Sequence, residues 1–316
     1  MVVSFTVSAD KSDSPMNEDT AAAGVTESER YLASLCRRAF LRLWSYQNLY
    51  RDQRAHPTGE GKELCDLLVI FGNDVIIFSD KECAVRPGKA PEIAWRRWYQ
   101  KAVLESVRQV VGAERWLISH PDRVFLDRAC QVPLPIDLPT SPTIHRVVTC
   151  RGIVEASRQK WHGGSGSLCV TNRPLVACLE EPFVLGSFDD DGRMVHVLDE
   201  VALDCVLATL DTISDFCGYL RRKEALFRAL QGVWAAGEEE LLGYYLGRFD
   251  PASGGHDFVR DQGIYSMVFE EGMWQGWRGS LAREAWESAN EVSYCWAEAL
   301  LRSSPGLLAR SSPPSA

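Results

Sequence analysis

Apolar residues recur along this chain with helical spacing in several long stretches. From residue 32 to residue 44 they return every three or four positions, which is the pattern of an amphipathic helix. Thr26-Glu-Ser-Glu29 just before them has the sequence of a capping box, so we expect this helix to begin there and to end near residue 46. The same spacing predicts further helices over residues 91–112, 199–223, 226–246 and 281–301.

Between the first two helices the pattern changes to that of strands. Residues 51–62 are polar and rich in Gly and Pro, so we expect a loop there. Two apolar runs then flank a Gly-Asn-Asp turn between Glu63 and Lys81, which predicts a hairpin. Prolines at 133, 135, 139 and 142 argue against regular structure. Shorter runs predict strands at residues 116–119, 123–126, 143–150, 167–171, 183–186 and 194–198.

This order of elements predicts an α/β core followed by a largely α-helical C-terminal half. We expect residues 1–26 and 303–316 to be disordered tails, since they lack apolar periodicity or are rich in proline. Residues 27–155 would form the core, and residues 156–302 would pack on it. No apolar run approaches the roughly 20 residues that cross a bilayer, and no signal peptide opens the sequence, so a cytoplasmic protein without a membrane partner is expected.

Cysteine and charge add two expectations. The 10 cysteines are scattered among apolar residues without metal-ligand spacing, which favours buried, reduced thiols. The net charge of −9 argues against a uniformly basic surface for nucleic acid, although residues 29–115 hold 15 Lys/Arg and 11 Asp/Glu. Acidic runs lie further on, at residues 180–181, 189–191 and 238–240. A solvated surface is the usual explanation of such runs, and they also favour a protein partner for the C-terminal half.

The hairpin carries the residues that point to chemistry. Asp66 opens its first strand and Lys81 closes its second, 15 residues later. Such groups at the ends of buried strands cost free energy unless they face each other or share a ligand such as a metal ion. This segment resembles the kernel of the PD-(D/E)XK, or restriction-endonuclease-like, nucleases, and the resemblance covers roughly residues 27–112.

The resemblance implies an αββα core with a mixed sheet and a nuclease that uses Mg²⁺ or Mn²⁺, with DNA a more probable substrate than RNA. Asp66 matches the first metal ligand of that family and Lys81 its motif lysine. The second acid should stand at position 79, which is Ser79 here. Three alternatives are open: Asp80 replaces that acid if a bulge re-aims it, Ser79 holds the metal through water, or the site has decayed.

Three further polar residues are candidates for the same site. Glu29 extends the apolar stripe of the first helix, where the family has a helical acid, and is also the last member of the capping box. Glu63 lies three residues before Asp66, which in a regular strand is the opposite face. Gln109 in the second helix resembles a glutamine that some of these nucleases use, although an exposed helix residue is the preferred explanation.

Other motifs favour structure over chemistry. The segment His162-Gly-Gly-Ser-Gly-Ser167 lacks the ending of a phosphate-binding loop and reads as a turn. Trp274, Trp277, Trp286 and Trp296 have near-helical spacing and read as core. The leading hypothesis is therefore a metal-dependent nuclease. The alternatives are an inactive nuclease fold that binds nucleic acid or a protein, and a purely structural adaptor.

Overall fold

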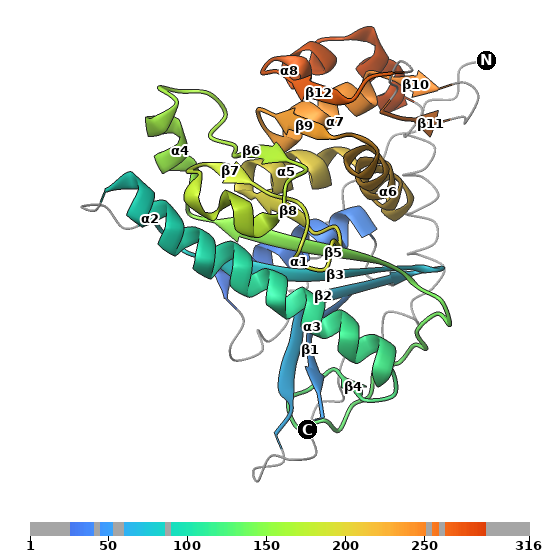
Figure 1. Cartoon of the computed structure of the whole chain (residues 1–316). Coiled ribbons are helices and arrows are strands. Elements are labelled where there is room, and N and C mark those ends of the chain that lie inside the picture. Colours follow the sequence, from blue (N-terminus) through green and yellow to red (C-terminus); the bar gives the residue numbers. More distant parts are fainter. Residues whose placement is uncertain are drawn as a thin grey trace, which may run out of the picture.

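A six-stranded mixed sheet forms the centre of the protein (Figure 1). The computed structural model describes residues 26–40, 45–52, 60–85, 90–250, 255–258 and 263–288. The strand order is β4-β1-β2-β3-β5-β8. Neighbours from β4 to β3 are antiparallel, whereas β3, β5 and β8 are parallel. Its strands are β1 (Ser45–Arg51), β2 (Lys62–Phe71), β3 (Asp74–Glu82), β4 (Val124–Phe125), β5 (Thr143–Arg151) and β8 (His196–Asp199).

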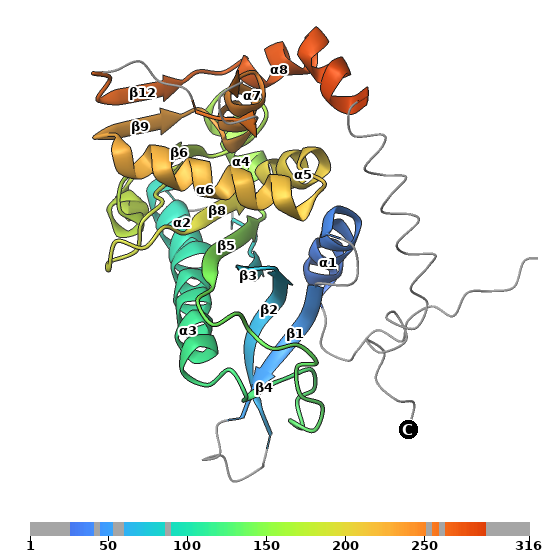
Figure 2. The ribbon, with the colours of Figure 1, turned by 90° about the vertical axis from the view of Figure 1, so that its right-hand side faces the viewer.

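Helices cover both faces of this sheet (Figure 2). One face packs against a continuous helical stretch made of α2 (Pro91–Trp98), the π-helical segment η1 (Tyr99–Leu104) and α3 (Glu105–Ser119). The other packs against α1 (Glu27–Phe40), α5 (Glu200–Thr209) and α6 (Ile213–Ala229). The α/β class and the mixed sheet that the pattern predicted are therefore confirmed.

The hairpin predicted from the two apolar runs around the Gly-Asn-Asp turn is confirmed. β2 and β3 are antiparallel and their turn pairs Phe71 with Asp74. Gly72 has a φ of +56°, a conformation that costs glycine little, so the turn residue suits its position. The side chains of β2 and β3 alternate between the two cores, with Val75 and Ile77 on the α3 side and Ile76 and Phe78 on the other.

A second, four-stranded sheet lies beyond α6, in the order β12-β9-β6-β7. Figure 2 shows α6 between the two sheets, and residues of both sheets share one buried cluster with this helix. The sheet consists of β6 (Cys169–Thr171), β7 (Val184–Leu185), β9 (Gly232–Ala235) and β12 (Ser266–Phe269). The remaining elements are α4 (Val154–Lys160), the 3-10 helix η2 (Leu175–Glu180), α7 (Glu238–Leu246), β10 (Phe249–Asp250), β11 (Gly255–His256) and α8 (Met273–Arg278).

Several expected elements are corrected near the start of the chain. The described part of the first helix ends at Phe40, residues 41–44 lie outside the described residues, and Ser45 and Tyr46 at the expected helix end begin strand β1 instead. Pairing with β2 outweighs the local pattern there. Residues 116–119 were expected to be a strand but form the last turn of α3. The strands expected at 123–126, 143–150, 167–171, 183–186 and 194–198 are confirmed at their centres.

The C-terminal half also departs from its periodicity. The helix expected over 199–223 is two helices, because Leu210 to Thr212 interrupt it and Thr212 caps the second one. The helix expected over 226–246 contains strand β9 between α6 and α7. Residues 281–288 are helical as expected, and the rest of that helix and both tails lie outside the described residues. In the described residues no helix is long and apolar enough to cross a membrane.

The solvent exposure of the cysteines, the tryptophans and the acidic run 238–240 can be compared with what the sequence predicted. The described cysteines are free and mostly buried, and Trp277 is buried with Trp274 and Trp286 packed against the same core. The expectation that the acidic run 238–240 is a solvated surface is wrong, since each of its three glutamates is at most 2% exposed. They bind partners inside the fold, including an ion pair between Glu238 and Lys223 at 2.5 Å. Trp296 lies outside the described residues.

Candidate functional site

Asp66 lies at the point where β2 and β3 separate. The last residues paired between the two strands are Leu67 and Phe78. Beyond them the backbone N–H of Asp80 donates to Oδ2 of Asp66 at 2.6 Å. The side-chain carboxylate therefore accepts a hydrogen bond that a backbone carbonyl would accept in a continuous pair of strands. Asp66 is only 7% exposed. The end of the ladder therefore holds a buried carboxyl group.

A bulge in β2 brings Glu63 to Asp66. The register of β1 against β2 slips by one residue at Leu64. Leu64 and Cys65 consequently both join the core on the α3 side. Glu63 pairs with Tyr50, whose neighbour Leu49 belongs to that core. Asp66 is influenced by the charge of Glu29 on α1, so both acids are assigned to the α1 side. The carboxyl groups of Glu63 and Asp66 are hydrogen-bonded. Regular alternation would have put them on opposite faces, so that expectation is wrong.

Glu29 approaches the same place from α1. The capping box is formed as expected: Glu29 accepts from the Thr26 N–H at 2.9 Å, and Thr26 Oγ1 accepts from the Glu29 N–H at 3.2 Å. The negative charge of Glu29 acts on Asp66. We call Glu29, Glu63 and Asp66 the Asp66 cluster.

The electrostatics of this cluster disfavour ionised Asp66. Burial raises the pKa of its carboxyl group to about 8, with further increases from the hydrogen bond to Glu63 and from the charges of Glu63 and Glu29. The N–H of Asp80 opposes the shift, because it favours the charged form. At neutral pH Asp66 is therefore mostly protonated unless a cation offsets the surrounding negative charge.

Ser79 and Lys81 lie on the other side of the sheet. The Ser79 hydroxyl donates to Oε1 of Gln109 on α3 at 2.9 Å, so Ser79 faces α3. The register of β3 with β5 is continuous from Asp74 to Glu82, and alternation then directs Lys81 to the same side as Ser79. The structure therefore separates Lys81 from the Asp66 cluster, whereas we expected Asp66 and Lys81 to face a common pocket.

Asp80 faces the α1 side without a bulge in β3. Its charge raises the pKa of the Cys36 thiol on α1, after the larger effect of burial. The Thr149 hydroxyl donates to Oδ1 of Asp80, and the Arg151 guanidinium lies 3.5 Å from the same oxygen. Oδ2 of Asp80 and Nη2 of Arg151 are buried without hydrogen-bond partners. Arg151 stacks over the Tyr31 ring at 4.8 Å, so the cation beside Asp80 is Arg151.

Sequence patterns did not single out Thr149 or Arg151. They lie at the end of a strand that was expected, but nothing local distinguishes them from other strand residues. Their relevance follows from the parallel pairing of β3 with β5, which matches Asp80 with Thr149.

A separate group of metal-ligand side chains lies at the other end of the sheet. Ligand atoms of Asp74, His145 and Cys217 all lie within 4.8 Å of one another. In the part of the chain that the structure describes, the acids of the Asp66 cluster and Asp80 do not form such a group.

Searches of protein-family models, curated proteins and solved structures find no match to this chain.

Proposed function

We propose that this protein is a metal-dependent nuclease with a restriction-endonuclease-like core, in which the Asp66 cluster holds Mg²⁺ or Mn²⁺. The observation that carries the proposal is the buried Asp66 carboxyl beside Glu63 and Glu29, with its pKa raised to about 8. A buried carboxylate beside two more solvent-accessible acids is unfavourable unless a proton or a cation neutralises it. A bound cation would neutralise the acids of the Asp66 cluster and would also give the cluster a role in catalysis.

The donor chemistry suits a hard divalent ion, which would draw the three acids closer together than they lie in this structure. All three groups supply carboxylate oxygens, which Mg²⁺ and Mn²⁺ prefer, and Glu63 and Asp66 already contact each other. When bound, such an ion supplies a Lewis acid for a phosphoryl oxygen and lowers the pKa of its water. Asp80 serves this set through its backbone N–H, which orients the Asp66 carboxylate.

Arg151 takes the role that the resemblance assigned to Lys81. It carries positive charge on the side of the sheet where the acids lie, and its Nη2 is buried without a hydrogen-bond partner. A guanidinium so placed would bind a phosphate oxygen and stabilise negative charge that develops on it. Lys81, on the α3 side, would then contribute little to the reaction.

The test is cleavage of duplex and single-stranded DNA by the purified full chain with Mg²⁺ or Mn²⁺. D66N and E63Q should each abolish cleavage and weaken Mn²⁺ binding measured by calorimetry. K81A should retain most of the activity, and R151K should lose more of it than K81A. The matched control is E82Q, which removes an exposed acid at the end of β3. Cleavage that persists in D66N, or no cleavage and no Mn²⁺ binding by the native chain, would overturn the proposal.

The second candidate is a nuclease fold without activity that binds nucleic acid or a protein. The Ser79–Gln109 hydrogen bond favours it, since it fills the position of the missing acid with a closed polar contact. This candidate predicts DNA or protein binding that EDTA does not change. A nuclease predicts DNA cleavage that EDTA stops.

A further inference from the structure

The sheet face beneath α6 has polar groups at its N-terminal end as well as at the Asp66 end. Asp74 begins β3, and His145 lies near the start of the parallel strand β5. Between these residues and Asp80 the face is apolar: Ile76, Phe78 and Val147 are fully buried and belong to one cluster with Phe216 of α6. A polar group at this end therefore needs its own explanation.

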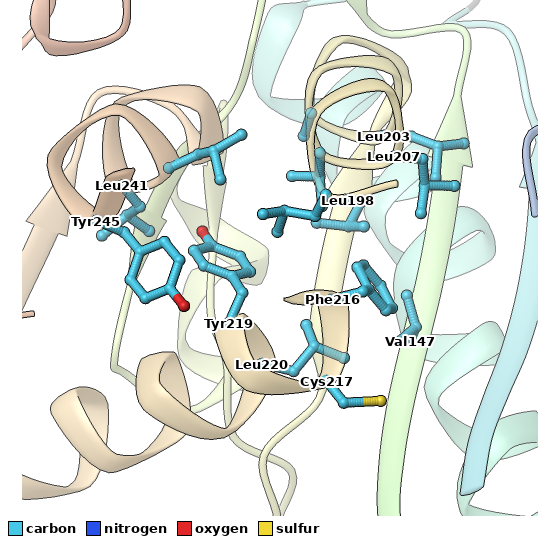
Figure 3. Close-up of a cluster of buried hydrophobic side chains, with 14 of the residues drawn as sticks. Val147, Leu198, Leu203, Leu207, Phe216, Cys217, Tyr219, Leu220, Leu241 and Tyr245 are labelled. Atoms are coloured by element: carbon cyan, nitrogen blue, oxygen red, sulfur yellow. The ribbon is translucent and has the colours of Figure 1, made fainter. Parts of the chain in front are cut away.

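Cys217 of α6 completes this polar end. It follows Phe216 along the helix, and Figure 3 shows its sulfur pointing toward β5 below Val147. The ligand atoms of Asp74, His145 and Cys217 all lie within 4.8 Å of one another, and His145 Nε2 is 2.8 Å from Asp74 Oδ1. His145 is 2% exposed and Cys217 is 1% exposed. A carboxylate, an imidazole and a thiol thus meet in a nearly dry place.

We propose that Asp74, His145 and Cys217 form a Zn²⁺ site. Oxygen, nitrogen and sulfur donors together are the ligand set of zinc and of other borderline transition metals, whereas Mg²⁺ takes oxygen ligands. The Nδ1 atom of His145 is buried without a hydrogen-bond partner, so hydrogen bonding in this structure does not account for the buried ring. The site is distinct from the Asp66 cluster and does not depend on the proposed nuclease activity.

Charge at the site is consistent with a cation. Arg221 Nη1 is 2.6 Å from Asp74 Oδ1, the same oxygen that His145 contacts. The Arg221 side chain is 47% exposed, so it can leave this oxygen for solvent. In the metal-free protein the guanidinium therefore supplies the positive charge that an ion would supply. A bound ion and Arg221 compete for Asp74.

Protonation states decide how the ion binds. Burial lowers the pKa of His145, so its ring is neutral and retains a lone pair for a metal. The bonds from His145 and Arg221 lower the pKa of Asp74 despite the opposing effect of its burial, so it is a carboxylate. Burial raises the pKa of the Cys217 thiol to about 12, so this group is protonated at neutral pH. Formation of the sulfur–metal bond must therefore release the thiol proton to solvent.

The ion would join α6 to the hairpin turn. Asp74 belongs to the turn end of β3, His145 to β5 and Cys217 to α6, so one ion connects three elements far apart in the sequence. Binding to the folded state alone raises stability by mass action. Zinc should therefore raise the melting temperature of the native chain.

The experiment is cobalt substitution in the full chain after treatment with a chelator and removal of any affinity tag. Co²⁺ should bind at one equivalent per chain with a thiolate-to-cobalt absorption band and release about one proton at pH 7. C217S should abolish the band. H145Q should weaken Zn²⁺ binding by more than the roughly 10–100-fold that the loss of an outer-shell partner costs. R221A should strengthen binding, because it removes the competing guanidinium.

Two controls separate this site from other thiols and from the nuclease site. Cys36 is fully buried in the same apolar cluster, and C36S should keep the band. D66N should also keep it, so failure of the nuclease proposal leaves this result unaffected. A missing band in the native chain, a band that survives C217S, or equal Zn²⁺ affinity of native and H145Q chains would overturn the proposal. The three residues would then be only a hydrogen-bonded contact between α6 and the sheet.

Discussion

At the scale of single residues, Asp66 combines two opposing influences. The Asp80 N–H favours its carboxylate, whereas burial and two neighbouring acids favour the neutral acid. The second influence is larger, since the pKa is raised to about 8. A protonated acid keeps the hydrogen bond to Glu63 without charge repulsion. The residue therefore binds either a proton or a cation.

Asp66 should make stability depend on pH in a predictable direction. Its pKa is about 8 in the folded chain and about 3.9 in the unfolded chain, so the folded state binds more protons between these values. Its contribution to stability is fully present below the unfolded pKa and decreases by up to about 1.4 kcal/mol per pH unit as pH rises toward 8. D66N should remove this slope and be more stable than the native chain at pH 8.

Chemical denaturation at several pH values measures this slope. Because an asparagine oxygen can still accept from the Asp80 N–H, D66N isolates the charge from the hydrogen bond. Saturating Mg²⁺ should reduce the pH slope in the native chain and leave D66N unchanged. An identical pH slope in both proteins would show that Asp66 is already ionised when folded.

Ser79 and Gln109 provide a second test at this scale. Their hydrogen bond of 2.9 Å joins β3 to α3, and Ser79 is 1% exposed. S79A should lower the free energy of unfolding by about 1 kcal/mol, because it leaves the Gln109 oxygen with one donor fewer. A double-mutant cycle with Q109L should give a coupling energy of about 1 kcal/mol. Additive effects of the two substitutions would show that this contact contributes no stability.

At the scale of elements, one bulge decides which residues form the Asp66 cluster. β3 keeps its register with β5 throughout, so Ser79 and Asp80 point to opposite faces. β2 slips at Leu64, so Glu63 and Asp66 lie on one face although they are three residues apart. Period-two alternation therefore predicts correctly which face of the sheet each β3 side chain occupies, whereas it fails for the acids of β2. A bulge depends on the partner strand, which a local pattern does not contain.

The boundary between α5 and α6 also depends on capping. Thr212 Oγ1 accepts from the Asp215 N–H at 3.1 Å, which satisfies a donor at the start of α6. T212A should destabilise the protein by about 1 kcal/mol, measured by urea unfolding. S214A changes an exposed residue two positions after Thr212 and should lower the free energy of unfolding by less than about 0.5 kcal/mol. Equal effects of the two substitutions would contradict the capping role.

At the scale of the whole molecule, α6 connects the two sheets. It packs on the six-stranded sheet through Phe216 and binds α7, next to the second sheet, through Lys223. Lys223 and Glu238 are each 1% exposed, and the Tyr219 hydroxyl also donates to Glu238 at 2.7 Å. A buried pair of this kind keeps the two parts in one arrangement, because separating the charges inside the protein is costly.

Removing one member of that pair should destabilise the entire fold. K223M leaves the Glu238 charge buried without its cation and should cost about 3–5 kcal/mol in thermal or urea unfolding. The double variant K223M/E238L should recover most of this loss. The matched control is R228Q, which breaks an exposed pair with Glu224 on the same helix and should cost less than about 1 kcal/mol. A small effect of K223M would mean that the pair is not desolvated in solution.

Local signals in the sequence determined much of the sheet and some of its helices. The capping box at Thr26 correctly predicted the start of α1, and the two apolar runs on either side of Gly72 correctly predicted the β2–β3 hairpin. The residues of the Asp66 cluster were also visible as candidates, because acids at the ends of apolar elements are conspicuous. Each of these signals lies within a few residues, where backbone geometry alone relates pattern to structure.

Only the tertiary structure decided which of those candidates meet. It joined Glu63 to Asp66 through the bulge at Leu64, directed Lys81 away from both, and brought Arg151 to Asp80. It also brought Cys217 to His145, residues with no relation in the pattern. The physical reason is that strand register and helix packing are set by contacts between distant segments, while periodicity reports only which positions of one segment share a face.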